Sequence, residues 1–255
     1  LVNFVTKRAG EKDFSRFTLS HSGHNLFGGY LDFSYRFGRN RDWGARVNIE
    51  KVDGETAVDG QRVKSSSVYV NLDHRDDRSK TNIFAGYREN EIINGQRWFK
   101  LASAVTRFPS VPDHSRNYAF NGMDKASYGW VMAFNHEQKF NDDWKWFMNF
   151  GLLHNKLNKN VMYEYSALTI LNDNGDFNIR EQSSTTPQKA YYWQAGVHGK
   201  VTMGEVVNNL TLAVDRAWRL RDGTRSFATY HLGTGNIYTG ILNQIAPAYS
   251  GYESY

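Results

Sequence analysis

The stretch WGARVNIE (residues 43–50) alternates apolar and polar side chains along its whole length. Because successive side chains of a strand point to opposite faces, this pattern predicts a β-strand with one apolar face and one polar face. The apolar face carries Trp43, Ala45, Val47 and Ile49. A slip of one residue would turn Arg46 to the apolar side, so we expect one register to be strongly preferred.

The same alternation recurs about nine times, with turn residues between the runs. The predicted strands lie near residues 14–20, 31–37, 43–50, 68–73, 81–88, 130–137, 145–152, 190–201 and 210–215. Their connections alternate between short and long. The short ones are 38–42, 75–80, 141–143 and 203–206, and the long ones are 53–63, 89–125, 156–188 and 221 onward.

This asymmetry of the connections is typical of outer-membrane barrels, which have tight periplasmic turns and extended outer loops. A compact soluble domain rarely keeps several structureless loops longer than about 15 residues. The polar faces carry Arg, Glu, Asp, Asn and Gly, which suit a hydrated lumen, and the apolar faces carry Trp, Tyr and Phe near strand ends, which suit interfacial belts. We therefore predict an all-β fold, a transmembrane antiparallel β-barrel.

Composition excludes several other classes. No run approaches the ~18 apolar residues that a membrane-spanning helix needs. The chain has no Cys, so it has neither a disulfide framework nor a thiolate metal site. The net charge is +5, but Lys and Arg are scattered singly, so no nucleic-acid surface is expected.

Seven segments, taken in order, resemble the TonB-dependent siderophore receptor family. They are LVNFVTKRAG (1–10), FGGYLDFSYRFG (27–38), RVNIEKVDGETAVDG (46–60), FPSVPDHSRNYAF (108–120), FNDDWKWFMNFGL (140–152), NNLTLAVDRAWRLRDG (208–223) and GNIYTG (235–240). The first is similar to the last strand of the family's N-terminal plug, and the others are similar to barrel strands and outer loops. The resemblance implies that residues 1–10 end a plug domain and residues 11–255 form part of a receptor β-barrel.

The family implies a barrel of about 22 strands, which nine strands cannot close, so we expect a partial chain. It also implies function: an outer-membrane receptor of a Gram-negative bacterium that binds a ferric siderophore and imports it by TonB-dependent active transport. The implied partners are the ferric siderophore as transported ligand, TonB with its inner-membrane energising complex, and lipid with lipopolysaccharide. No covalently bound cofactor is implied.

The resemblance places the ligand among inward aromatic and polar side chains of the outer barrel. The chelate already wraps its iron in oxygen donors, so hydrogen bonds and ring faces are expected rather than metal ligands. Counting the turn at residues 21–25 as the first outer loop, the long connections 53–63, 89–125, 156–188 and 221 onward are the second to fifth. The candidates are Arg88, Arg97, Trp98, Phe99, Phe108 and Tyr118 around the third outer loop, with His154 and Tyr163 beyond the seventh strand. The alternative for each is that it packs the loop onto itself or lies at the membrane interface.

Other interpretations find less in the residues. His21 and His24 lie three apart in a short turn with no nearby third ligand, so no metal site is assigned. No nucleophile, base and orienting group share a signature, so an enzyme is not expected. The remaining alternatives are a TonB-dependent transporter of haem, cobalamin or an oligosaccharide, a passive porin, and a soluble ligand-binding β domain.

Overall fold

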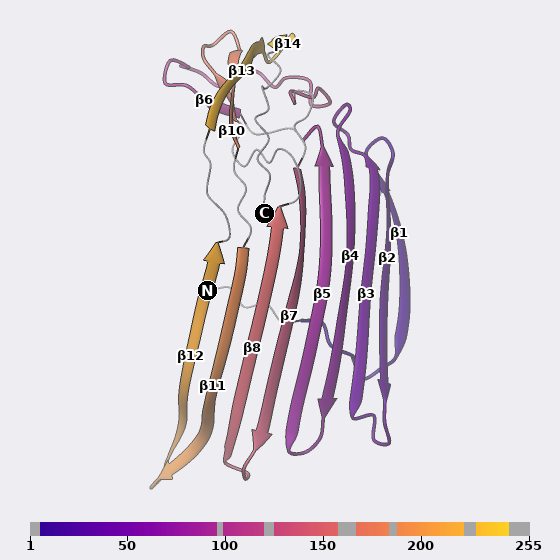
Figure 1. Cartoon of the computed structure of the whole chain (residues 1–255), viewed down its shortest axis with the longest axis vertical. Helices are drawn as coiled ribbons and strands as arrows, with labels where there is room; N and C mark the ends of the chain where they lie inside the picture. The colour runs from indigo at the N-terminus through magenta and orange to yellow at the C-terminus, as the bar shows by residue number, and fades with distance from the viewer. Residues whose placement is uncertain are drawn as a thin grey trace.

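The computed structural model describes residues 6–95, 99–119, 125–157, 167–183, 188–221 and 228–244. Nine of its strands form one antiparallel sheet in the order β1-β2-β3-β4-β5-β7-β8-β11-β12 (Figure 1). Their bounds are β1 Phe14–Ser22, β2 Leu26–Phe37, β3 Trp43–Glu55, β4 Arg62–Arg75, β5 Ser79–Ile93, β7 Lys125–Lys139, β8 Trp144–Leu157, β11 Gln188–Met203 and β12 Val206–Arg221. The nine predicted strands are confirmed, although most are longer than predicted.

The sheet buries its polar face and exposes its apolar face. Along β2, Asp32, Ser34 and Arg36 are 3%, 1% and 2% exposed. The neighbouring Phe33 and Tyr35 point the other way and are 39% and 46% exposed. A soluble sheet would show the opposite pattern, because burial of apolar area is what stabilises it in water. The exposed apolar face therefore fits hydrocarbon, as the sequence predicted.

Aromatic side chains mark both ends of the apolar face. Trp146, near the short turns, packs on His136 with ring centroids 4.9 Å apart, and His154, near the long loops, packs on Trp130 at 5.5 Å. Trp146 and His154 are eight residues apart on β8, a rise of roughly 26 Å in a strand. With the strand tilt of about 35–45° that is usual in such barrels, this length spans roughly 20 Å of the membrane, which is close to the height of an apolar band about 25 Å tall.

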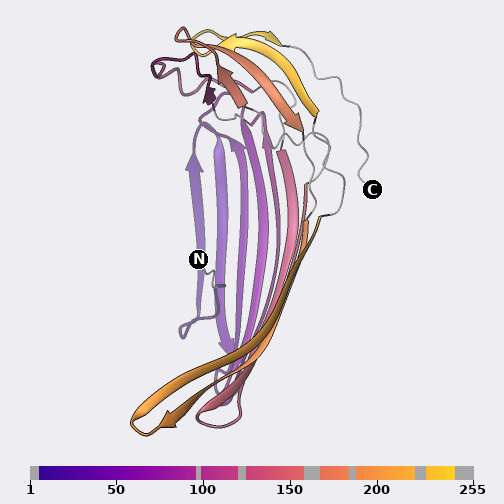
Figure 2. The same ribbon diagram turned by 90° about the vertical axis from the view of Figure 1, so that its left-hand side faces the viewer.

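The long loops contain a second sheet, which corrects the expectation that they are structureless. It has five strands in the order β14-β13-β10-β9-β6 and lies across one end of the large sheet (Figure 2). The bounds are β6 Phe99–Leu101, β9 Ala167–Ile170, β10 Asp176–Ser183, β13 Ala228–Asn236 and β14 Gly240–Gln244. These strands come from three different loops, so no single loop carries the alternation that would have predicted them.

The second outer loop is also shorter than predicted, because β3 and β4 continue to Glu55 and from Arg62. The described part of the chain has no helix long and apolar enough to cross a membrane.

Two substitutions on β8 test which face meets lipid. Phe150 on the apolar face is 41% exposed and Leu153 on the polar face is 42% exposed, so exposure to water alone predicts the same result for both. We expect Phe150→Arg to destabilise the folded protein in membranes by about 2–4 kcal/mol and Leu153→Arg to have little effect. The measurement is the urea midpoint of unfolding in liposomes, and equal shifts for the two variants would contradict the assignment.

Candidate functional site

The polar face of β2 to β5 is a wall of buried hydrophilic side chains. Its members are Asp32, Ser34, Arg36, Ser65, Ser67, Asn71, Asp73 and Asn82, all 7% exposed or less. Residues 6–13 lie against this wall. Residues 6–13 form no strand, so the strand expected for residues 1–10 is absent over residues 6–10. Residues 1–5 lie outside the described residues.

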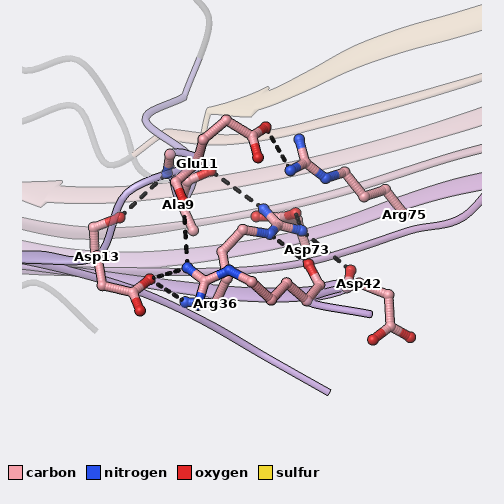
Figure 3. A network of polar contacts seen from close by, with 10 residues as sticks. Ala9, Glu11, Asp13, Arg36, Asp42, Asp73 and Arg75 are labelled. Atoms are coloured by element: carbon pink, nitrogen blue, oxygen red, sulfur yellow. Dashed lines mark hydrogen bonds and ion pairs between the residues drawn. The ribbon is translucent and has the colours of Figure 1, made fainter. Parts of the chain in front are cut away.

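Arg36 is the centre of the contact between residues 6–13 and the wall (Figure 3). Its guanidinium donates to Asp73 Oδ2 at 3.0 Å, and the side chains of this pair are 1% and 8% exposed. It also donates to the carbonyl oxygens of Ala9 at 3.3 Å, Arg41 at 2.7 Å and Asp42 at 3.1 Å. A buried guanidinium is tolerable only when its donors have acceptors such as these, so these contacts depend on one another.

Two more arginines bind main-chain carbonyls of the same segment. Arg46 donates to Arg8 O at 3.0 Å while its other donors hold Asp32 at 2.9 and 2.8 Å. Arg41 donates to Glu11 O at 3.3 Å. The segment is thus held largely through its backbone, by donors that lie on the wall.

The close approach of Ala9 to the wall requires a glycine at position 44. A Cβ on Gly44 would lie 2.6 Å from Asp73 Oδ1, 2.7 Å from Arg36 Nη1 and 2.8 Å from Ala9 Cβ. Any side chain here would push the segment away from the ion pair.

Two carboxylates of the segment complete the attachment. Asp13, directly before β1, accepts from Arg41 at 2.6 Å and from the backbone N–H of Arg36 at 2.9 Å. The hydrogen bond from Arg41 and the one from that N–H lower the pKa of Asp13. Glu11 accepts from Arg75 at 2.5 Å, which lowers its pKa in the same way. Asp13 and Glu11 each stabilise the attached segment at pH values above their ordinary carboxyl pKa. This stabilisation is lost as the pH falls through their lowered pKa values.

A pocket of about 280 Å³ remains between the segment and the wall, beside Lys7, Glu50 and Asn71. The Asn71 amide donates to Thr6 Oγ1 at 3.3 Å, but Asn71 Oδ1 has no hydrogen-bond partner among the described residues. The wall is therefore polar beyond what residues 6–13 use.

Removing one member of the buried pair tests how firmly the segment is held. Arg36→Met leaves the Asp73 carboxylate buried and unpaired, and we expect a loss of about 3–5 kcal/mol in unfolding free energy. Arg36→Met combined with Asp73→Leu should recover most of that loss. Urea unfolding in detergent micelles measures both.

The control is Arg62→Met, which breaks an ion pair whose side chains are 48% and 41% exposed and should cost below about 1 kcal/mol. A single Arg36→Met variant no less stable than this control would show that the pair does not hold the segment.

The outer sheet has its own small hydrophobic core. Tyr118, Leu168, Ile170, Phe177 and Ile237 are 1–4% exposed, and Phe99 packs against them. The rings of Phe99 and Tyr118 meet edge to face at 5.2 Å. These residues come from the third, fourth and fifth outer loops, so the core joins the three loops into one layer.

Hydrogen bonds cross between the same loops. The Tyr118 hydroxyl donates to the carbonyl of Ile237. Asp173 of the fourth loop accepts from the backbone N–H of Thr106 at 2.8 Å and from its hydroxyl, which together lower the pKa of Asp173. The stabilisation of the layer by the Asp173 carboxylate is therefore lost when the pH falls through that lowered pKa.

Tyr118→Phe should loosen the outer layer, because it leaves the buried Ile237 carbonyl without its donor, at a cost of about 1–3 kcal/mol. Hydrogen exchange at residues 167–177 should speed up by an order of magnitude or more, while exchange in β3 and β4 stays unchanged. Unchanged exchange at residues 167–177 would show that the loops are held independently.

The structure separates the predicted ligand residues into three groups. Arg88 lies on the polar face of β5 and is exposed, and Phe108 is 89% exposed in the outer layer. Phe99 and Tyr118 pack in the outer core, as the alternative for them held. His154 lies on the apolar face against Trp130, turned away from any ligand on the polar face. Arg97, Trp98 and Tyr163 lie outside the described residues.

The alternation places Arg46 correctly on the polar face but does not predict its contact with residues 6–13, or that of Arg36. The signal that could have found them is the isolated Gly44 within an alternating strand, which marks a close backbone approach. His21 and His24 also have ordinary partners: the His21 ring packs on Phe27 at 4.6 Å, and His24 Nδ1 lies 3.0 Å from Thr56 O.

Comparison with known proteins places this fold. No family model matches the chain. The chain is 25% identical over 223 residues to the ferrichrome receptor FcuA of Yersinia enterocolitica, covering 86% of this chain and 28% of that protein.

Two solved structures are similar over almost the whole chain. BauA, the ferric preacinetobactin receptor of Acinetobacter baumannii, superimposes with a TM-score of 0.82 at 20% identity over 97% of this chain and 36% of its own. Fiu, the ferric-catecholate import receptor of E. coli K12, gives 0.68 at 11% identity over 95% and 39%. All three relatives are receptors rather than enzymes, and this chain spans well under half of each. The chain therefore has the fold of the siderophore receptors, and the resemblance inferred from its sequence is confirmed.

Proposed function

We propose that this chain is part of an outer-membrane receptor of a Gram-negative bacterium that binds a ferric siderophore and imports it with energy supplied through TonB. The single observation that carries the proposal is the sheet with an exposed apolar face and an inner polar wall already bound to a polypeptide segment.

That occupied wall argues against a passive porin. A porin lumen is a water-filled channel, whereas the polar wall here is bonded to residues 6–13 through Arg36, Arg41 and Arg46. The exposed apolar face argues against a soluble domain. We propose that residues 1–10 end a plug domain and that residues 11–255 are a part of the barrel around it.

The ligand surface is proposed to lie between the polar face and the outer layer. Arg88 and Phe108 remain in the proposed ligand set because they are exposed. Arg97, Trp98 and Tyr163, outside the described residues, also remain in it. Phe99 and Tyr118 support that surface from the outer core. His154 instead suits the membrane interface, where lipid and lipopolysaccharide are the proposed partners.

Binding and uptake can be tested separately. The purified protein is titrated with ferrichrome, a ferric tris-catecholate and haem, following quenching of its seven tryptophans. Cells carrying it are then given the bound chelate with radioactive iron. We expect binding of at least one ferric chelate, and uptake that stops when a protonophore collapses the inner-membrane gradient while surface binding persists.

Uptake at full rate without the gradient would identify a passive channel. Failure to bind either ferric chelate would defeat the siderophore assignment, and binding of haem alone would indicate a different transported ligand.

A further inference from the structure

The polar face changes character on β7, β8, β11 and β12. There, side chains that alternation assigns to the polar face are apolar or absent. We call these residues, together with the aromatic Tyr192 that lies between Gly151 and Ala217, the apolar floor: Val131, Ala133, Gly151, Leu153, Ala190, Tyr192 and Ala217. The strand register joins them in two adjacent rows across the four strands. In β7 the result is an unbroken apolar run over residues 130–134, inside an otherwise alternating strand.

The floor lines a hollow of about 470 Å³. Four of its members, Ala133, Gly151, Ala190 and Ala217, have small side chains or none, which leaves space above the backbone. A Cβ on Gly151 would meet only Tyr192 Cβ at 3.8 Å, which is ordinary contact, so nothing in the backbone of the sheet requires a glycine there. Gly86, on the floor's border, is different: its Cβ would lie 2.2 Å from the Tyr69 ring.

Polar and aromatic residues frame the floor. On the side of the short turns, the Asn135 amide donates to Asn149 Oδ1 at 2.8 Å, and the Asn149 amide donates to Gln194 Oε1 at 2.9 Å. At the β4–β5 border, the Tyr69 and Phe84 rings stack at 6.0 Å. The register places Phe84 beside Ala133. The apolar character is therefore confined to a patch with defined edges.

Two cationic side chains, Arg88 and Arg219, lie at the border of the floor. The register places Arg88 beside Gly129 in the next row toward the outer layer, and Arg219 beside Ala190 at the far end of the floor. Both are exposed, and within the described residues neither forms an ion pair. Arg36 and Arg46, on the same face, are both paired with carboxylates. The cations around the floor are thus available to an anion.

We propose that the apolar floor is the subsite for an aromatic group of the transported chelate, and that this chelate is anionic. This rests on the proposed function above. A ferric tris-catecholate fits, because its aryl rings match an apolar surface that includes the Tyr192 ring, and its negative charge matches Arg88 and Arg219. A ferric tris-hydroxamate is neutral, since each hydroxamate cancels one charge of the iron, and it gains nothing from the two unpaired guanidiniums.

The floor spans roughly 14 Å from β7 to β12, at about 4.8 Å per strand, so one chelate covers it. A ligand resting there touches Arg219 directly and reaches Arg88 across Gly129. Removing either charge should therefore weaken an anionic chelate and leave a neutral one unaffected.

The first test fills the hollow. Gly151→Leu places a side chain on the floor without a backbone clash, and we expect it to weaken a ferric tris-catecholate by about tenfold or more. The matched control is Gly29→Leu, because a Cβ on Gly29 also has open space, with Phe17 at 3.9 Å, but lies on the apolar face of β2. Affinities come from tryptophan quenching of the purified protein in detergent micelles.

The second test removes charge. Arg219→Gln should weaken the ferric tris-catecholate about tenfold and leave ferrichrome within about twofold. Arg216→Gln, on the opposite face beside Trp218, is the control and should change neither affinity. Added salt should weaken binding of the tris-catecholate to the unsubstituted protein more than to Arg219→Gln.

The outcomes distinguish a failure of the proposed function from a failure of the proposed subsite. If neither ferric chelate binds the unsubstituted protein, the proposed function itself fails. If a chelate binds but Gly151→Leu leaves its affinity unchanged, the floor is not the subsite. If Gly151→Leu lowers only the unfolding midpoint, the floor packs against polypeptide instead. Tighter binding of ferrichrome than of the tris-catecholate would overturn the anionic class.

Discussion

A strand that crosses hydrocarbon must pair all its backbone amides within a sheet and must turn its apolar side chains outward. The seven inner strands of the large sheet meet the first demand, since each pairs with a neighbour on both sides, while β1 and β12 pair on one side. The second demand is met as well: Phe33, Tyr35 and Phe150 are exposed while Asp32, Ser34 and Arg36 are buried. We call this arrangement, with apolar side chains outward and polar side chains inward, the inversion. What the inner face can bind depends on it. Because polar side chains fill the inner face, that face can bind polypeptide and ligand through charge and hydrogen bonds.

The inner face has two regions that differ in their side chains. On β2 to β5 the charges are paired with one another or with residues 6–13, and Arg36 alone joins Asp73, Ala9 and two further carbonyls. On β7 to β12 the face is apolar at its centre, and Arg219 at its edge has no paired carboxylate among the described residues. The first region holds residues 6–13, and the second is the surface that we propose for a ligand. The outer layer, closed by Tyr118 and Phe177, lies beyond both.

Alternation predicted the large sheet well because it is a local property of each strand. All nine strands, their faces and the four short turns could be derived from the period of two, including the placement of Arg46 on the inner face. The outer layer could not, because its core assembles Tyr118, Leu168 and Ile237 from three separate loops. The predicted ligand set stays a prediction, although Tyr118 and Phe99 lie in the outer core. The apolar floor was overlooked because it interrupts the alternation and forms no motif of its own.

The most direct test of the inversion uses the absence of cysteine in this protein. Single cysteines are introduced along β8 at residues 148 to 153, and the protein is inserted into liposomes that contain a lipid-bound quencher. Fluorophores attached at 148, 150 and 152 should be quenched from the lipid, whereas cysteines at 149, 151 and 153 should react with a water-soluble thiol reagent. Uniform reactivity at all six positions, or reactivity with the opposite parity, would contradict the account.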